Sequence, residues 1–188
     1  MAAQRGARKT KAVRKSAKAA KKPAQRLQQT PRTSAARIAT SRAKTANAHE
    51  GVRYLLTRYC HALDRGNLAE VGALFHHDAT FAVSFEGGQH HTGRETIQAW
   101  YERFFNERPG EHRHMRHKIF EPMVSVHGTN ATASTYFDAD SVAPDGSVRV
   151  IAGRYDDTLM KEQGQWFFKE RTITVLYHYS PGSCQEGM

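Results

Sequence analysis

The spacing of apolar residues changes at Pro109-Gly110, and this change constrains the fold more than any other feature of the sequence. Before it, apolar side chains recur every three to four residues, as on one face of a helix. After it, the chain has the pattern of extended runs separated by short turn signals, at residues 112–127, 130–142, 147–161 and 165–178. Consecutive strand candidates joined by tight turns are typical of an antiparallel meander.

Helices and one hairpin are predicted before the strands. The helices are expected at residues 49–64, 68–75 and 93–108, and the hairpin at residues 79–92. This order predicts an α+β domain in which a curved antiparallel sheet, a cone-shaped α+β barrel, is closed by three N-terminal helices. A sheet of this kind has a concave face, where we expect an apolar pocket for a small ligand.

The basic charge of the chain is concentrated at its N-terminus. Residues 1–50 hold 14 Lys and Arg against one acidic residue, Glu50, and they contain no aromatic residue. A segment with so little apolar area cannot offset the entropy of folding. We therefore predict a disordered tail at 1–48, a folded domain at 49–179 and a C-terminal tail at 180–188.

Three interpretations of residues 1–48 remain open. The run KTKAVRKSAKAAKK resembles lysine-alanine tails that neutralise phosphates, which predicts a weak, salt-sensitive contact with nucleic acid or another polyanion. A basic, acid-poor segment is also typical of an organelle-targeting peptide, and a misassigned start would add upstream codons to the chain.

The cysteine content and the hydropathy both favour a cytoplasmic protein. Cys60 and Cys184 are the only cysteines, so a disulfide framework is not expected. No apolar run approaches the roughly 20 residues of a membrane span, and no secretory segment is recognisable. We expect no membrane contact.

The stretch EHRHMRHKIF contains three histidines that an extended strand would separate. Alternation places His112 and His114 on one face and His117 on the other, together with the apolar residues Met115 and Ile119. A metal site needs ligands that converge on one ion, so no metal is expected here. His117 is left as a titratable group on an apolar face.

Several motifs together resemble the SnoaL-like family of the nuclear transport factor 2-like superfamily, across about residues 49–178. They are YCHALDRGNLAEVGALFHHDATF, GRETI, the histidine strand and GRYDDTLMKEQGQWFFKER. The arrangement is most similar to scytalone dehydratase and bile-acid dehydratase-like members. The resemblance implies a tyrosine on the first helix, an aspartate at its end and a histidine on the first long strand, which match Tyr59, Asp64 and His117. It also implies a homo-oligomer, a dimer or trimer.

The chemistry of these three residues is consistent with proton transfer. A carboxylate that binds one ring nitrogen of a buried histidine fixes its tautomer and stabilises the imidazolium, so Asp64 would make His117 a general base. Asp64 also opposes the helix dipole, at a cost of about 0.3–1 kcal/mol, so helix energetics do not favour it there. Tyr59 would donate to a substrate oxygen; the alternatives are that Asp64 faces water and that Tyr59 is a packing residue.

Further residues are expected to bind the substrate. The resemblance implies an acid on the next strand, matched by Asp140, and an arginine, for which Arg154 and Arg171 compete. Arg171 could instead bridge strands to Asp156 or Asp157. The apolar wall is expected to include Met115, Trp100 and Phe137. The histidines that we expect to be exposed are His61, His76, His77, His90, His91, His127 and His178.

Together these features predict a cofactor-free dehydratase or isomerase. The substrate would be small and apolar or aromatic, of polyketide- or steroid-like character, and His117 would remove a proton next to a carbonyl. No cofactor is expected, because the sequence has no phosphate-cradling glycine loop. The alternative is a non-catalytic ligand- or partner-binding module, tethered to a polyanion by its basic tail.

Overall fold

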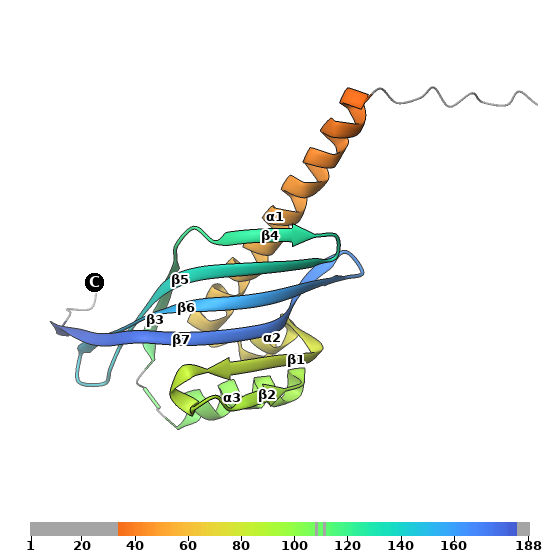
Figure 1. Ribbon diagram of the computed structural model, residues 1–188. Helices are drawn as coiled ribbons and strands as arrows, with labels where there is room; N and C mark the ends of the chain where they lie inside the picture. The colour runs from red at the N-terminus through yellow and green to blue at the C-terminus, as the bar shows by residue number, and fades with distance from the viewer. Residues whose placement is uncertain (1–33, 108, 111, 184–188) are drawn as a thin grey trace, which may run out of the picture. The chain divides into compact units, whose positions relative to one another are not determined.

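The computed structural model describes residues 34–107, 109–110 and 112–183. The fold is α+β, as predicted, with helices preceding most of the strands (Figure 1). The helices are α1 (Ser34–Asp64), α2 (Leu68–Ala73) and α3 (Arg94–Asn106), and a 3-10 turn covers Ser84–Glu86. The strands are β1 (Phe75–Val83), β2 (His90–Thr92), β3 (Arg113–Ile119), β4 (Met123–His127), β5 (Asn130–Val142), β6 (Ser147–Glu162) and β7 (Gln165–Ser183).

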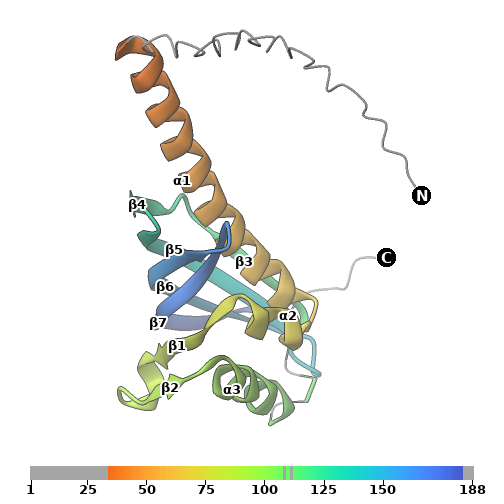
Figure 2. The same ribbon diagram turned by 90° about the vertical axis from the view of Figure 1, so that its right-hand side faces the viewer.

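All the described strands belong to one sheet, in the order β2-β1-β7-β6-β5-β3, with β4 pairing with β5 beyond the end of β3. The predicted meander is present, because β5, β6 and β7 pair antiparallel in sequence order. In contrast, β1 pairs with β7 in parallel, so the sheet is mixed and largely antiparallel. Figure 2 shows α1 crossing one face of this sheet.

The apolar stripe of α1 supplies one wall of the core, as its helical spacing predicts. Val52, Leu56 and Tyr59 are fully or almost fully buried, and Phe75 and Phe168 meet them from β1 and β7. Burial of aromatic rings of this size removes the largest apolar areas from water, so these contacts hold α1 against the sheet.

The helix α1 begins earlier than the predicted domain boundary. Residues 34–48 were expected in a disordered tail, but they form the first part of α1, and this part is mostly exposed and extends beyond the sheet (Figure 2). Alanine is frequent here and has the highest helix propensity, which explains the continuation. The rest of the predicted tail, residues 1–33, lies outside the described residues.

The predicted strand 112–127 is divided in two. β3 ends at Ile119 and β4 starts at Met123, with Pro122 between them. Proline cannot donate a hydrogen bond to a neighbouring strand, so it interrupts the ladder there. At the other end of the chain, β7 continues to Ser183, beyond the predicted end of the domain, and the remaining residues of the predicted C-terminal tail are outside the described part.

Within the described residues, no helix is both long and apolar enough to cross a lipid bilayer. Cys60 is buried as a free thiol, and Cys184 lies outside the described residues.

Candidate active site

His117 and Asp64 meet where the end of α1 packs against β3. The ring Nδ1 of His117 lies 2.7 Å from Oδ1 of Asp64, and the backbone N–H of His117 donates to both carboxylate oxygens at 3.0 and 3.2 Å. The side chains are 8% and 19% exposed, respectively. One carboxylate thus fixes both the backbone and the ring of His117, and Nε2 is the nitrogen left to accept a proton.

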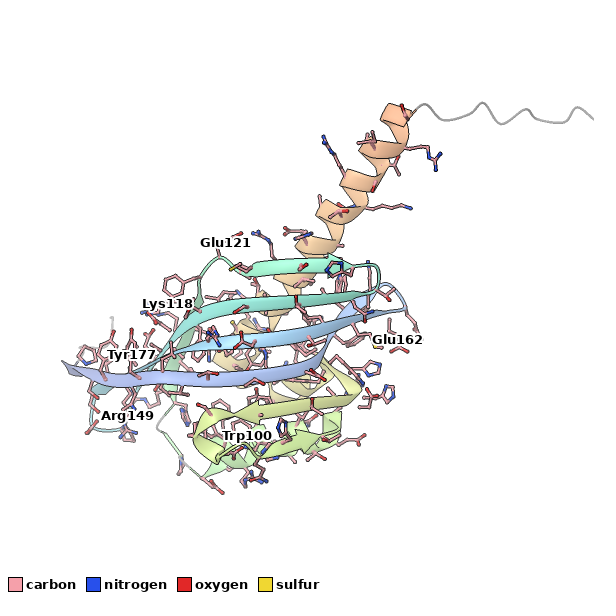
Figure 3. The ribbon with its side chains drawn as sticks, viewed as in Figure 1. Trp100, Lys118, Glu121, Arg149, Glu162 and Tyr177 are labelled. Atoms are coloured by element: carbon pink, nitrogen blue, oxygen red, sulfur yellow. The ribbon has the colours of Figure 1, made fainter. Side chains whose placement is uncertain are left out.

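A cavity of about 690 Å³ adjoins this pair, and His117 is part of its wall. The predicted wall residues Met115, Trp100 and Phe137 also line it. Trp100 comes from α3 (Figure 3), whereas Met115 and Phe137 come from the sheet. The concave side of the fold therefore contains the apolar pocket that the element order predicts.

Stacked aromatic rings give the cavity flat walls. Phe137 and Tyr155 stack with centroids 4.1 Å apart and planes 7° from parallel. Trp100 and Phe104 stack at 5.2 Å and 15°. Such surfaces bind planar apolar ligands better than compact polar ones.

Two tyrosine hydroxyls provide a polar point in this apolar cavity. The hydroxyl oxygens of Tyr59 and Tyr101 are 2.7 Å apart, and both residues line the cavity. Burial raises the pKa of Tyr59 to about 12 and raises the pKa of Tyr101 well above its usual value. Both phenols are neutral near pH 7, so the pair holds two hydroxyl hydrogens, and the contact between the two oxygens uses one of them. Tyr101 was missed as a site residue, although its place on the apolar face of α3 was a signal for it.

Arg171 does not line the cavity, contrary to its predicted role in substrate binding. Its Nε and Nη2 donate to Asp157 at 2.7 and 2.8 Å, and both side chains are 0% exposed. Its guanidinium lies over the rings of Tyr59, Tyr155 and Phe168, at 4.0, 4.4 and 3.8 Å from their centroids. Arg171 therefore bridges β7 to Asp157 of β6, which is the alternative to substrate binding that the sequence left open.

The two other predicted polar contacts are also occupied within the protein. Arg154 does not line the cavity, because alternation along β6 turns it to the face opposite Tyr155, where it pairs with Asp156 at 2.8 Å. Asp140 does lie at the cavity wall, but its carboxylate pairs with Arg116 at 2.9 Å and Lys118 at 2.8 Å.

His112 lies in the cavity wall with His117, although strict alternation predicted opposite faces. The pairing of β3 with β5 shifts register between Arg113 and Arg116, and His114 has a φ of 49°. This irregularity breaks the two-residue period, so the face of His112 could not be read by counting.

Two histidines expected at the surface are buried. His76 contacts Asp78 through Nδ1, and His91 lies 2.9 Å from Glu86. Ligand atoms of His76, His77 and Asp78 lie within 4.8 Å of one another, which is the spacing of a metal site. However, the Lys169 ammonium is 2.5 Å from Asp78, so a cation there would have to displace it.

Comparisons with known proteins identify the fold. A protein described as "Putative Scytalone Dehydratase" from Novosphingobium aromaticivorans superposes with a TM-score of 0.64 at 20% identity, over 77% of this chain and 96% of that chain. The hexachlorocyclohexane dehydrochlorinase LinA-type3 from Novosphingobium barchaimii gives a TM-score of 0.65 at 14% identity, over 77% and 97%. A protein of unknown function from Mycobacterium tuberculosis gives 0.62 at 19%, over 71% and 74%.

A search of curated proteins gave no match. The model of a family described as "SnoaL-like domain" matches residues 44–172, which include α2, α3 and β1 to β6 in full. A nuclear transport factor 2-like protein is also among the structural neighbours. The chain therefore belongs to the SnoaL-like domain family and has the nuclear transport factor 2-like fold.

Proposed function

We propose that the protein is a cofactor-free enzyme that removes a proton next to a carbonyl group and then eliminates water or moves a double bond. The observation that carries this proposal is the 2.7 Å contact between His117 Nδ1 and Asp64 beside an open aromatic cavity. A non-catalytic binding module would need the cavity but not an oriented base on its wall.

Each group has a defined part in the elimination. Nε2 of His117 takes the proton from the carbon next to the carbonyl, and Asp64 stabilises the imidazolium that forms. The carbonyl oxygen gains negative charge and accepts a hydrogen bond from the Tyr59–Tyr101 pair. The carbon electron pair then forms the double bond, the β carbon–oxygen bond breaks, and the imidazolium proton leaves with the hydroxide as water.

Isomerisation would use the same first step. The imidazolium would return its proton to a different carbon, and no bond to oxygen would break. Two structural neighbours have names that denote eliminations, of water and of hydrogen chloride, which supports elimination as the more general outcome.

The proton-removal step can be tested without knowing the natural substrate. The protein is incubated in D₂O with 2-tetralone, a bicyclic ketone with acidic carbon-bound hydrogens, and deuterium uptake is followed by NMR. A panel of bicyclic β-hydroxy ketones is assayed in parallel for loss of water by mass spectrometry. Wild type is expected to accelerate uptake, and His117→Ala to reduce it by at least about 100-fold.

Arg154→Gln is the matched control, because Arg154 lies on the opposite face of the sheet from the cavity. It is expected to retain wild-type exchange. Equal exchange rates for wild type and His117→Ala, with both proteins folded by circular dichroism, would overturn the proposal.

A further inference from the structure

One part of the exposed rim of the cavity is polar and basic, unlike the aromatic interior, although Ile151 and Tyr179 lie beside it. Arg149 and His178 line it, with the hydroxyl residues Ser141 and Ser180. Both Arg149 and His178 are exposed, as expected for a cavity mouth. Arg149 lies near the start of β6, at the opposite end of that strand from Glu162 (Figure 3).

The strand register places Arg149 on the cavity side of the sheet. Ala139 pairs with Ile151 and Ser141 pairs with Arg149, two residues further along the same two strands. Residues that pair in register share a face, and the face repeats every two residues. Phe137 stacks on Tyr155 in the cavity wall, and Ser141 lies four residues further along the same strand, so Ser141 and its partner Arg149 are on the cavity side.

The charges around the mouth favour an anion. Among the described residues, Asp140 is the one acidic residue of the wall, and Arg116 and Lys118 hold its carboxylate. Asp145, in the turn before β6, is fully exposed, and hydrogen bonds from Ser147, helped by the charge of Arg149, lower its pKa. Because Asp145 is fully exposed, water screens its charge strongly, so it offsets the positive charge of the rim only weakly.

We propose that Arg149 and His178 form a binding site for a singly charged oxyanion of the substrate, a carboxylate or a sulfonate, while the rings of the substrate lie between the stacked aromatic walls. The planar guanidinium suits two parallel hydrogen bonds to such a group. The position of the reacting carbon relative to this anion rests on the proposed function.

The sheet geometry gives the span between the two recognition points. His117 pairs with Ala139, and Ala139 pairs with Ile151, so His117 is two strands away from β6 and Arg149 is two residues further along. Two strand spacings and two residues of rise give about 12 Å between the backbones of His117 and Arg149. Both side chains are on the cavity side, so the distance between their ends is shorter than the distance between the backbones. A fused two- or three-ring molecule with its anionic group at one end spans that shorter distance.

Two probes with the same rings separate the anion site from the apolar cavity. They are 8-anilinonaphthalene-1-sulfonate and N-phenyl-1-naphthylamine, which lacks the sulfonate. Binding of each to the full chain is measured by fluorescence titration, and competition between them shows whether they share the cavity. Arg149→Gln is expected to weaken sulfonate binding at least about fivefold, as for a partly screened charge-assisted contact, and to leave the neutral probe unaffected.

Further variants make the test specific. Arg154→Gln, which removes the same charge from the other face of β6, is expected to change neither affinity. Arg149→Lys retains the charge but loses the planar fork of the guanidinium, so its affinity for the sulfonate should lie between those of wild type and Arg149→Gln. If Arg149→Gln fails to fold, Arg149→Lys replaces it in the test. An equal effect of Arg149→Gln on both probes, or no effect on either, would overturn the proposal.

The outcome is independent of the catalytic proposal. His117→Ala should retain the preference for the sulfonate, because His117 does not take part in the anion site. Absence of deuterium exchange with an intact probe preference would reject the proposed enzyme and keep the anion site. Normal deuterium exchange without a preference for the sulfonate probe would keep the proposed enzyme and reject the anion site.

Discussion

The guanidinium of Arg171 donates to both carboxylate oxygens of Asp157, and neither side chain is exposed to solvent. This ion pair joins β7 to β6 directly beneath the aromatic rings that include Tyr59 of the cavity wall. Loss of one partner leaves an uncompensated charge in the interior, which is far more costly than loss of a surface pair.

Asp157→Asn is therefore expected to lower the free energy of unfolding by about 3–5 kcal/mol, measured by urea denaturation with tryptophan fluorescence. Asp156→Asn is the matched control, because Asp156 is the adjacent residue but is 39% exposed and pairs with Arg154 at the surface. It should cost less than about 1 kcal/mol. Equal losses for the two variants would contradict a structural role for the buried pair.

The buried tyrosines predict a loss of stability at high pH. Burial raises the pKa of Tyr59 from 10.0 to about 12, and raises the pKa values of Tyr101 and Tyr155 as well. An acid whose pKa is raised by folding stabilises the fold fully below its unfolded pKa, and this contribution is lost as the pH rises from 10 through the folded value.

The free energy of unfolding should accordingly decrease between about pH 10 and 12. Addition of denaturant at pH 11 should also increase the tyrosinate absorbance, because unfolding lets these phenols ionise. Tyr59→Phe is expected to reduce the increase. An absorbance that does not change on unfolding at pH 11 would show that the phenols already ionise in the folded protein.

Asp64→Asn tests whether the charge of the carboxylate matters apart from its shape. The amide oxygen can still accept from the backbone N–H of His117, so the free energy of unfolding should fall by only about 1–2 kcal/mol. The amide cannot stabilise an imidazolium, so the deuterium exchange rate of 2-tetralone should fall by about 100-fold or more. Exchange at the wild-type rate would show that Asp64 only holds the strand in place.

Gly51 lies within α1 at a point where a side chain would collide with Trp166. A Cβ at this position would lie 2.8 Å from Cδ1 of the indole. Replacement of glycine by alanine in an open helix stabilises by about 1 kcal/mol, but here we expect Gly51→Ala to destabilise by about 1–3 kcal/mol. In a Trp166→Ala background, the same substitution should be stabilising. Thermal unfolding measures the effect of Gly51→Ala in both backgrounds. A stabilising effect in the wild-type background would contradict the clash.

Binding of the basic N-terminal part of the chain to a polyanion stays a prediction. The exposed part of α1 belongs to this basic region and provides a test. Arg37, Arg42 and Lys44 are exposed on this part of the helix. If they contact phosphates, replacing all three by glutamine should reduce the slope of log affinity for duplex DNA against log salt by about 2–3. Arg154→Gln should leave the slope unchanged. No retention of the full chain on DNA at low salt would reject the interpretation.

Local signals in the sequence predicted the elements better than their pairing. The range predicted for the strand at 130–142 is that of β5, because turn residues flank it on both sides. The parallel pairing of β1 with β7 was not predicted, because contacts between strands so far apart in sequence leave no local pattern. The start of α1 was placed at residue 49 because the preceding residues contain too little apolar area to predict a folded segment, whereas the structure continues the helix over residues 34–48.

Contacts in the candidate site could be predicted where they depend on the arrangement of helices and strands. They could not be predicted where they depend on the exact register of a strand. His117 and Asp64 were expected together and are in contact, although their catalytic role stays a prediction. Arg154 and Arg171 could not be distinguished, because only the register shows which of them faces the interior. His112 was assigned to the wrong face, since a break in strand alternation has no reliable sequence signal.

The helix α1 carries its terminal carboxylate at one end and its exposed basic segment at the other, and the two ends differ in how much change in length they allow. Insertion or deletion of one residue between Gly51 and Asp64 turns everything beyond it by about 100° relative to the sheet, which would swing the carboxylate away from the imidazole. The same event before residue 48 alters only the reach of the projecting part. Homologous chains can therefore lengthen or shorten this helix freely at its start, while the number of residues in its last four turns is fixed by the contact of Asp64 with His117.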